Sequence, residues 1–272
     1  MQNIMIAVLG MSILGLFWAL VLVFANKQFF VKEDPLVEKV IESLPGVNCG
    51  ACGFAGCGAC GDAIVTKKES PTICPVCNDQ TKEDIAEMLG RKIVKDPNQI
   101  KLIAKVHCAG SKKYLKLRAE KYNGYPSCAV ENITGGGTKA CTYGCLGHGD
   151  CVKVCPVEAI AMNSDGLPVV DEQKCISCEK CVLECPRSII KMVPENQEVF
   201  ILCSSKDPGK VARQVCDVSC IGCGICVKNE EQGSFQLKDF LATVDYQNSQ
   251  KVSLEKLREV ATKCPRKIIT VK

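Results

Sequence analysis

The stretch CISCEKCVLECPRSII, residues 175–190, decides the fold of the second half of this chain. Its four cysteines stand at C-x₂-C-x₂-C-x₃-C spacing, and proline follows the last of them. A run upstream, CTYGCLGHGDCVKVCPVEAI at residues 141–160, also ends in Cys-Pro after three other cysteines. Thiolates at this spacing are typical ligands of 4Fe–4S clusters. The two runs therefore predict two clusters, with zinc sites as the remote alternative.

The ligands of the two runs are expected to cross. In two-cluster ferredoxins the fourth cysteine of each run ligates the cluster of the other run. The upstream run departs from the pattern, because His148 stands where its middle cysteine is expected. Either His148 is itself a ligand or Cys141 supplies the missing thiolate, and we favour Cys141 because thiolates are the usual ligands. The predicted sets are Cys141, Cys145, Cys151 and Cys185 for one cluster and Cys155, Cys175, Cys178 and Cys181 for the other.

An imperfect copy of this unit follows. The stretch CIGCGICVKNEEQ, residues 220–232, begins with the same spacing but has Glu230 where Cys-Pro is expected. CPRSIIKMV, which begins at Cys185, recurs as CPRKIITVK from Cys264. This is an internal repeat of a βαββαβ-like ferredoxin unit. One cluster keeps all its ligands in the copy, namely Cys220, Cys223, Cys226 and Cys264.

The other cluster of the copy has lost all four ligands together. Counted back from the final Cys-Pro, its other three positions hold Leu254, Leu257 and Val260. Their spacing suits a helix whose apolar side chains fill the vacated volume. The copy is therefore predicted to be a one-cluster module.

Four cysteines lie outside these motifs: Cys108, Cys128, Cys203 and Cys216. Cys108 and Cys203 each follow a short apolar run and precede a basic, helix-like segment. Two interpretations stay open for the four, a fifth cluster or buried structural thiols.

An apolar segment precedes the cysteine-rich part. Residues 4–25, IMIAVLGMSILGLFWALVLVFA, carry no charge and are long enough to cross a bilayer as a helix. A cleaved signal peptide is the alternative, but neither a basic n-region nor a small-residue cleavage site is clear. Lys27 and Lys32 follow the apolar segment, so the positive-inside tendency leaves the remainder in the cytoplasm. In that reducing compartment the 22 cysteines are expected to be metal ligands rather than disulfides.

A first cysteine-rich unit follows the membrane segment. DPLVEKVIESLPG predicts a short amphipathic helix capped by Asp34, and TKEDIAEMLGRKI predicts a helix that closes the unit near residue 95. Between them, NCGACGFAGCGACGDAI and the later Cys-Pro offer four thiolates with many glycines, which favours a 4Fe–4S cluster over a Cys₄ zinc site. Cys60 and Cys77 are left without a role. The predicted ligands are Cys49, Cys52, Cys57 and Cys74.

The whole chain is predicted to be α+β with at least four 4Fe–4S clusters, or five if the remaining cysteines assemble one. The net charge of +4 gives no reason to expect nucleic-acid binding. The chain has no P-loop and no GxGxxG motif that follows a strand in a βαβ unit, so it is not expected to bind NAD or flavin itself. The lysine-rich segment 101–121 is either a surface that steers an acidic ferredoxin or a solvated helix. The predicted domains are a transmembrane helix (1–27), a helical 4Fe–4S domain (28–95), a two-cluster ferredoxin module (96–200) and a one-cluster module (201–272).

These features together resemble a known family. One membrane helix, the NCGACGFAGCGACGDAI…CPVC unit and a following ferredoxin core resemble RnfB, the B component of Rnf-type ion-translocating ferredoxin:NAD⁺ oxidoreductase complexes. The family is called RsxB where it serves SoxR reduction. The resemblance covers nearly the whole chain, and its N-terminal unit is far more specific than the widespread ferredoxin motifs.

The resemblance implies a function. Cys49, Cys52, Cys57 and Cys74 would hold the cluster nearest the membrane. The ferredoxin clusters would accept electrons from soluble reduced ferredoxin and pass them to subunits that reduce NAD and move Na⁺ or H⁺. The expected location is the bacterial inner membrane, single-pass, with the cysteine-rich part in the cytoplasm. The alternatives are a membrane-tethered ferredoxin that reduces a soluble acceptor such as a SoxR-type regulator, and a zinc-binding scaffold.

Overall fold

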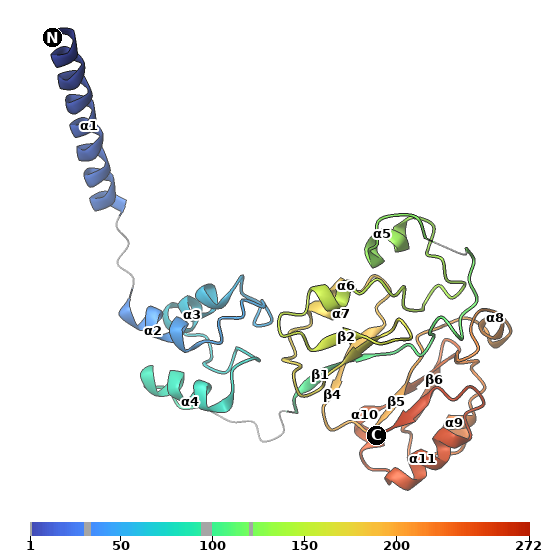
Figure 1. Cartoon of the computed structure of the whole chain (residues 1–272). Helices are drawn as coiled ribbons and strands as arrows, with labels where there is room; N and C mark the ends of the chain where they lie inside the picture. Colours follow the sequence, from blue (N-terminus) through green and yellow to red (C-terminus); the bar gives the residue numbers. More distant parts are fainter. Residues whose placement is uncertain (1, 30–33, 94–99, 120–121) are drawn as a thin grey trace.

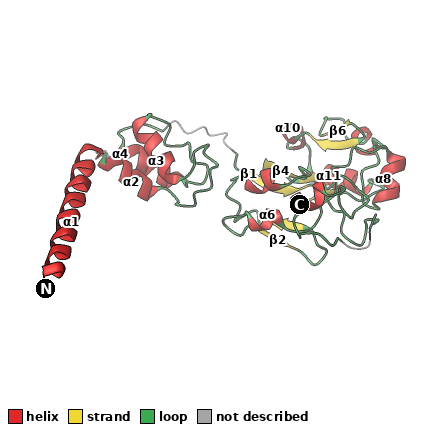
Figure 2. Ribbon diagram, turned by 90° about the horizontal axis from the view of Figure 1, so that it is seen from above, coloured by secondary structure: helices red, strands yellow, loops and turns green. Residues whose placement is uncertain are grey.

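The computed structural model describes residues 2–29, 34–93, 100–119 and 122–272, and Figures 1 and 2 show it from two directions. A helical unit lies toward one end, and two modules that contain the strands lie together at the other. The predicted boundary between residues 95 and 96 falls outside the described residues.

Helix α1, Gln2–Phe29, projects away from the rest of the molecule (Figure 1). Its large apolar side chains are exposed, from Ile4 at one end to Phe29 at the other. Among the described residues it is the one helix long and apolar enough to cross a membrane. It runs two residues beyond the predicted end at residue 27.

The helical unit consists of α2 (Pro35–Ser43), α3 (Cys57–Thr66) and α4 (Asp79–Met88). As predicted, Asp34 caps α2: its Oδ1 accepts a hydrogen bond from the Leu36 amide at 2.9 Å, which satisfies a free N–H of the first turn. The core of the unit includes Val40, Ile64 and Ile85, which are fully buried. The two predicted helices are therefore confirmed, and they enclose the cysteine-rich loop and α3.

The two modules repeat one order of elements. In each, a first strand is followed by two short helices, a hairpin and a last strand, with one helix before the last strand in the first module and two in the second. The first module has β1 (Leu102–Val106), α5 (Cys128–Ile133), α6 (Asp150–Lys153), β2 (Ile160–Met162), β3 (Pro168–Val170), α7 (Lys180–Glu184) and β4 (Ile190–Pro194). The second has β5 (Val199–Ile201), α8 (Gly209–Val215), α9 (Ile225–Lys228), β6 (Phe235–Lys238), β7 (Leu241–Val244), α10 (Tyr246–Ser249), α11 (Leu254–Thr262) and β8 (Ile269–Val271).

Strand pairing closes each module on itself. The first and last strands pair antiparallel, β1 with β4 and β5 with β8, so that Ile103 lies opposite Val193 and Phe200 opposite Thr270. The middle strands form the hairpins β2–β3 and β6–β7. Because β5 belongs to the second pair, that module begins by Val199, slightly before the predicted boundary at residue 201.

Apolar side chains take the place of the lost ligands in the second module. Leu257 and Val260 on α11 are fully buried in its core beside Phe235, while Leu254 is half-buried. Glu230, at the lost Cys-Pro position, is buried and accepts hydrogen bonds from the amides of Gln232 and Ser234, each at 2.6 Å. The apolar side chains at the three predicted positions therefore lie in or against the core of the module, and the Glu230 carboxylate organises its loop.

The basic segment after Cys108 is not a helix, contrary to the prediction. Residues 111–119 form turns in which Leu115 bridges to Cys216 and Leu117 bridges to Lys139. These backbone contacts with distant segments replace the hydrogen bonds that a helix would form within the segment. By contrast, helix α8 does follow Cys203, as expected.

Candidate metal centres

Every cysteine from Cys108 to Cys264 lines one of four cavities. Each cavity has four cysteines and is otherwise walled mainly by apolar side chains. The four sets are Cys128, Cys145, Cys151 and Cys185; Cys155, Cys175, Cys178 and Cys181; Cys220, Cys223, Cys226 and Cys264; and Cys108, Cys141, Cys203 and Cys216.

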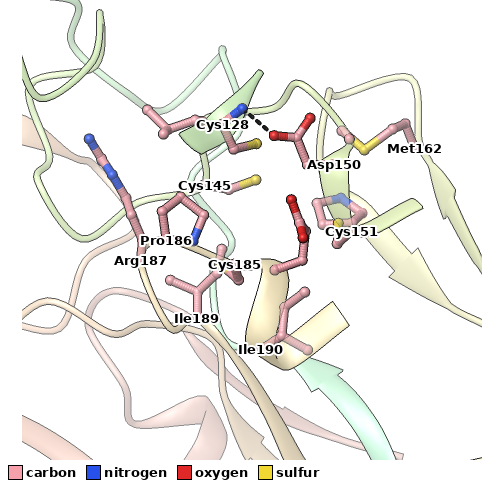
Figure 3. Close-up of a pocket in the computed structure, with 14 residues that line it drawn as sticks. Cys128, Cys145, Asp150, Cys151, Met162, Cys185, Pro186, Arg187, Ile189 and Ile190 are labelled. Carbon is pink, nitrogen blue, oxygen red and sulfur yellow. Dashed lines mark hydrogen bonds between the residues drawn. The ribbon is translucent and has the colours of Figure 1, made fainter. Parts of the chain in front are cut away.

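The first cavity encloses about 390 Å³ between α5, α6 and the Cys-Pro turn after α7. Figure 3 shows the thiols of Cys128 and Cys145 on one side of this space. The carboxylate of Asp150 holds Cys128 in place, because its Oδ2 accepts hydrogen bonds from the Cys128 amide at 2.6 Å and from Ser127 Oγ at 2.7 Å. Asp150 sits at the start of α6, so it joins α5 to the cysteine run.

The fourth thiol of this cavity differs from the predicted one. Cys128 occupies the place that was assigned to Cys141, and Cys141 lines another cavity. His148 does not line the first cavity either, since its Nε2 pairs with the buried carboxylate of Glu131 on α5. The Asp150 carboxylate and the His148–Glu131 pair both tie α5 to the run, which explains why a cysteine from α5 completes the set.

The second cavity, of about 330 Å³, brings together the four residues predicted for it. Cys155 crosses from the upstream run to the three cysteines of the downstream run, just as Cys185 crosses the other way. The Ala159 amide donates a hydrogen bond to Cys155 Sγ at 3.2 Å.

The third cavity, of about 390 Å³, also contains the four residues predicted for it. Its walls repeat those of the first cavity: Ile268 and Ile269 correspond to Ile189 and Ile190. Cys223 is exposed, so this cavity lies close to the surface.

The fourth cavity, of about 280 Å³, lies between the modules. Of the four cysteines left outside the motifs, the structure brings Cys108, Cys203 and Cys216 here, with Cys141 in place of Cys128.

The cysteines of the helical unit also gather. Burial, followed by the neighbouring thiols of Cys52, Cys74 and Cys57, raises the pKa of Cys60. A hydrogen bond from Cys77 lowers the pKa of Cys74. Cys60 and Cys77, which had no predicted role, therefore pack against three of the four predicted ligands. The fourth, Cys49, acts on Cys178 of the first module, whose pKa is raised by burial and then by nearby thiolates, Cys49 among them.

Thiols of neighbouring cavities lie close enough to shift one another's pKa. Burial raises the pKa of Cys151 to about 12, and thiolates of its own set and Cys181 of the second cavity add to the shift. Burial and then Cys108 of the fourth cavity raise the pKa of Cys145 to about 12. Burial likewise raises the pKa of Cys203 to about 12, with Cys220 of the third cavity contributing. Because thiolates are the ligands of iron, metal binding would release the protons of these thiols.

The thiol arrangement fits clusters better than single ions. A zinc ion requires its thiolates at about 2.3 Å, and no three His, Cys, Asp or Glu side chains among the described residues stand close enough for one ion. The thiols instead surround cavities. Four thiolates around an apolar space suit the four irons of a 4Fe–4S cluster.

Comparisons with known proteins agree with this chemistry. Residues 44–76 match the family model described as "Putative Fe-S cluster", and residues 139–190 match the "4Fe-4S dicluster domain". The chain is 40% identical, over 99% of its length and 79% of the relative, to the B component of the Na⁺-translocating ferredoxin:NAD⁺ oxidoreductase complex of Acetobacterium woodii. It is 38% identical, over 90% of its length and 85% of the relative, to the B component of the proton-translocating ferredoxin:NAD⁺ oxidoreductase complex of Clostridium ljungdahlii. It is 34% identical, over 85% of its length and 86% of the relative, to the B component of the ion-translocating oxidoreductase complex of Methanosarcina acetivorans.

Proposed function

Because this chain belongs to the RnfB family, the B components of ion-translocating oxidoreductase complexes, we propose that it is the iron–sulfur electron-transfer subunit of such a complex. It takes electrons from reduced ferredoxin and relays them to partner subunits that reduce NAD and translocate Na⁺ or H⁺. The active site for NAD is on those partners.

The observation that carries this proposal is the succession of thiol-lined cavities. When bound, 4Fe–4S clusters supply one-electron transfer. The chain holds them with thiolates, excludes water with apolar walls and donates backbone N–H groups to sulfur, as Ala242 does to Cys220 Sγ at 3.5 Å. Such hydrogen bonds tune the potential. The proposed sets are Cys49, Cys52, Cys57 and Cys74; Cys155, Cys175, Cys178 and Cys181; Cys128, Cys145, Cys151 and Cys185; and Cys220, Cys223, Cys226 and Cys264.

Electrons enter at the third cavity. Leu237, which lines this cavity, and Phe240, whose backbone contacts Gly222, have exposed apolar side chains near the exposed Cys223. An exposed apolar surface beside a cluster site suits the docking of a protein electron donor such as ferredoxin. At the other end, α1 anchors the helical unit to the bacterial inner membrane with the cysteine-rich part in the cytoplasm.

Anaerobic titration with reduced ferredoxin tests the function. The purified chain, brown when oxidised, is expected to bleach in the visible range and to gain the electron paramagnetic resonance signals of reduced clusters. A chain that contains zinc, or that stays oxidised with excess reduced ferredoxin, contradicts the proposal.

Co-purification separates the complex from a tethered ferredoxin that serves a soluble acceptor. A tagged chain extracted in mild detergent is expected to bring other membrane subunits with it. Recovery as a lone polypeptide that reduces a SoxR-type regulator at full rate would favour the alternative.

A further inference from the structure

We propose that Cys108, Cys141, Cys203 and Cys216 hold a fifth 4Fe–4S cluster, which joins the clusters of the two modules into one relay. This inference rests on the proposed function and adds a site to it. None of the four belongs to a C-x₂-C motif.

Each module contributes the same two positions to this site. Cys108 lies two residues after the end of β1, and Cys203 lies two residues after the end of β5. Cys141 precedes Cys145 by the same four residues by which Cys216 precedes the equivalent Cys220. A pair of positions that recurs in both copies and meets at one cavity is a pseudo-symmetric site, whereas unrelated buried thiols have no reason to coincide.

The main chain around the four thiols is fixed from both sides. Arg187, in the Cys-Pro-Arg turn of the first module, donates from Nη1 to the Cys141 carbonyl at 2.7 Å. Arg266, in the equivalent turn of the second module, donates from Nη2 to the Cys216 carbonyl at 2.6 Å. The Ala109 amide donates to the Leu202 carbonyl at 3.0 Å, which ties the Cys108 loop to the Cys203 loop.

The four thiols line one shared pocket. Cys141 and Cys216 on its walls are buried. The four cysteines are free thiols rather than disulfides. A 4Fe–4S cluster bound between them would use all four sulfurs as ligands.

The site lies directly between two cavities of the relay. The Cys145 amide donates a hydrogen bond to Cys108 Sγ at 3.4 Å, and the Cys220 amide donates to Cys203 Sγ at 3.2 Å. A ligand-bearing residue of each neighbouring cavity therefore contacts a thiol of this one. A cluster held by these thiols would supply one-electron transfer between the clusters of the third and first cavities.

The test counts iron in the full-length chain, purified anaerobically in detergent. The wild type is expected to contain roughly 20 irons and as many acid-labile sulfides, since five 4Fe–4S clusters hold four each. The variant Cys141→Ala/Cys216→Ala, which removes one thiol from each module, is expected to keep roughly 16 irons. Lys112→Ala/Lys210→Ala, which truncates one exposed lysine in each module outside the cavity, is the control and is expected to keep the wild-type content.

Each outcome decides between the two interpretations of these cysteines. Roughly 16 irons in the wild type, or equal iron in the wild type and the cysteine variant, overturns the fifth cluster and leaves the proposed function intact. Absence of iron from the wild type overturns both. If the cysteine variant does not fold, native mass spectrometry of the wild type decides: five clusters support the site and four overturn it.

Discussion

Asp150 is the residue on which the first cavity depends. Burial would raise its pKa, but hydrogen bonds from Ser127 and Lys153 and from the Cys128 and Ala129 amides outweigh burial and lower it. The carboxylate is thus charged at neutral pH, and it fixes the start of α5 so that Cys128 faces the cysteine run. The Asp150 carboxylate therefore brings the thiol of Cys128, which lies outside the motif, to the cavity of a cysteine run that lacks its middle cysteine.

Removing the Cys128 thiol tests this assignment. Cys128→Ala is expected to cost about four irons per chain, because one ligand of a 4Fe–4S cluster is lost. His148→Ala, the control, is expected to keep its iron, since His148 lies outside the cavity and the Asp150 carboxylate still holds the Cys128 amide. Iron and sulfide analysis measures both. Loss of iron in His148→Ala with retention in Cys128→Ala would restore histidine as the ligand.

The sequence contained part of this information. His148 marks a position of the upstream run without a cysteine, but Cys128 carries no motif, and only the folded α5 brings it to the cavity. A signal does exist for Cys141, because Cys216 stands at the same distance before the equivalent cysteine of the second module. That recurrence favours grouping Cys141 with Cys216, as the fourth cavity does, rather than with the run.

At the level of elements, α11 supplies apolar core side chains to a module that lacks the cysteines for a second cluster. Leu257 and Val260 point into the core that the second cluster would occupy, and they pack near Phe235. Ser253 caps the helix by accepting a hydrogen bond from the Lys256 amide at 3.4 Å. The apolar spacing and the Cys-Pro count predicted this helix, because both are local signals. The turn segment 111–119 was not predictable, because its partners Lys139 and Cys216 are distant in sequence.

Truncation of Leu257 tests whether α11 contributes to the free energy of unfolding in place of a cluster. Leu257→Ala is expected to destabilise the chain by about 2–5 kcal/mol, since the side chain is fully buried and its removal leaves a cavity. Leu254→Ala on the same helix, where the side chain is half-buried, is the control and should cost clearly less. The urea midpoint under anaerobic conditions, followed by circular dichroism, reports the difference. Equal costs for the two variants would mean that α11 is not a core element.

At the level of the whole molecule, an ion-pair bridge joins the two modules. Glu172 of the first module accepts hydrogen bonds from Lys105 at 3.0 Å and from Lys272, after β8, at 2.6 Å. Burial would raise the pKa of Glu172, but Lys272 and Lys105 lower it below its ordinary value. A carboxyl group with a lowered pKa stabilises the fold above its unfolded pKa, and this contribution disappears as the pH falls through the folded pKa.

Glu172→Gln is therefore expected to lose about 0.2–1 kcal/mol at pH 7, the range for partly exposed ion pairs. The deficit should begin to narrow as the pH falls below the unfolded pKa of 4.5, and it should disappear only below the lowered folded pKa, where the wild-type carboxyl group is protonated. Glu195→Gln, which removes an exposed pair with Lys101, is the control and should change little. Denaturation midpoints over this pH range measure both variants. A deficit that does not depend on pH would rule out the charge as its source.

The exposed apolar surface of α1 predicts how the chain attaches to the membrane. Removal of residues 1–29 from a chain expressed without partners is expected to move it to the soluble fraction with its iron unchanged, because α1 buries nothing of the remainder. Fractionation and iron analysis, compared with the full-length chain, measure this. A truncated chain that still sediments with membranes would indicate a second attachment surface.

The crossing of Cys155 and Cys185 has a consequence for biogenesis. Helix α6 carries Cys151 of the first cavity and is followed by Cys155 of the second, and α7 carries Cys181 of the second and is followed by Cys185 of the first. Insertion of one cluster immobilises both helices and so pre-forms the neighbouring site. Maturation of this pair is thus expected to be all-or-none, and oxygen damage at one cluster should spread to the other. The set of Cys220, Cys223, Cys226 and Cys264 exchanges no ligand with another set. Its cluster is therefore expected to be inserted, and to be lost to oxygen, independently of the others.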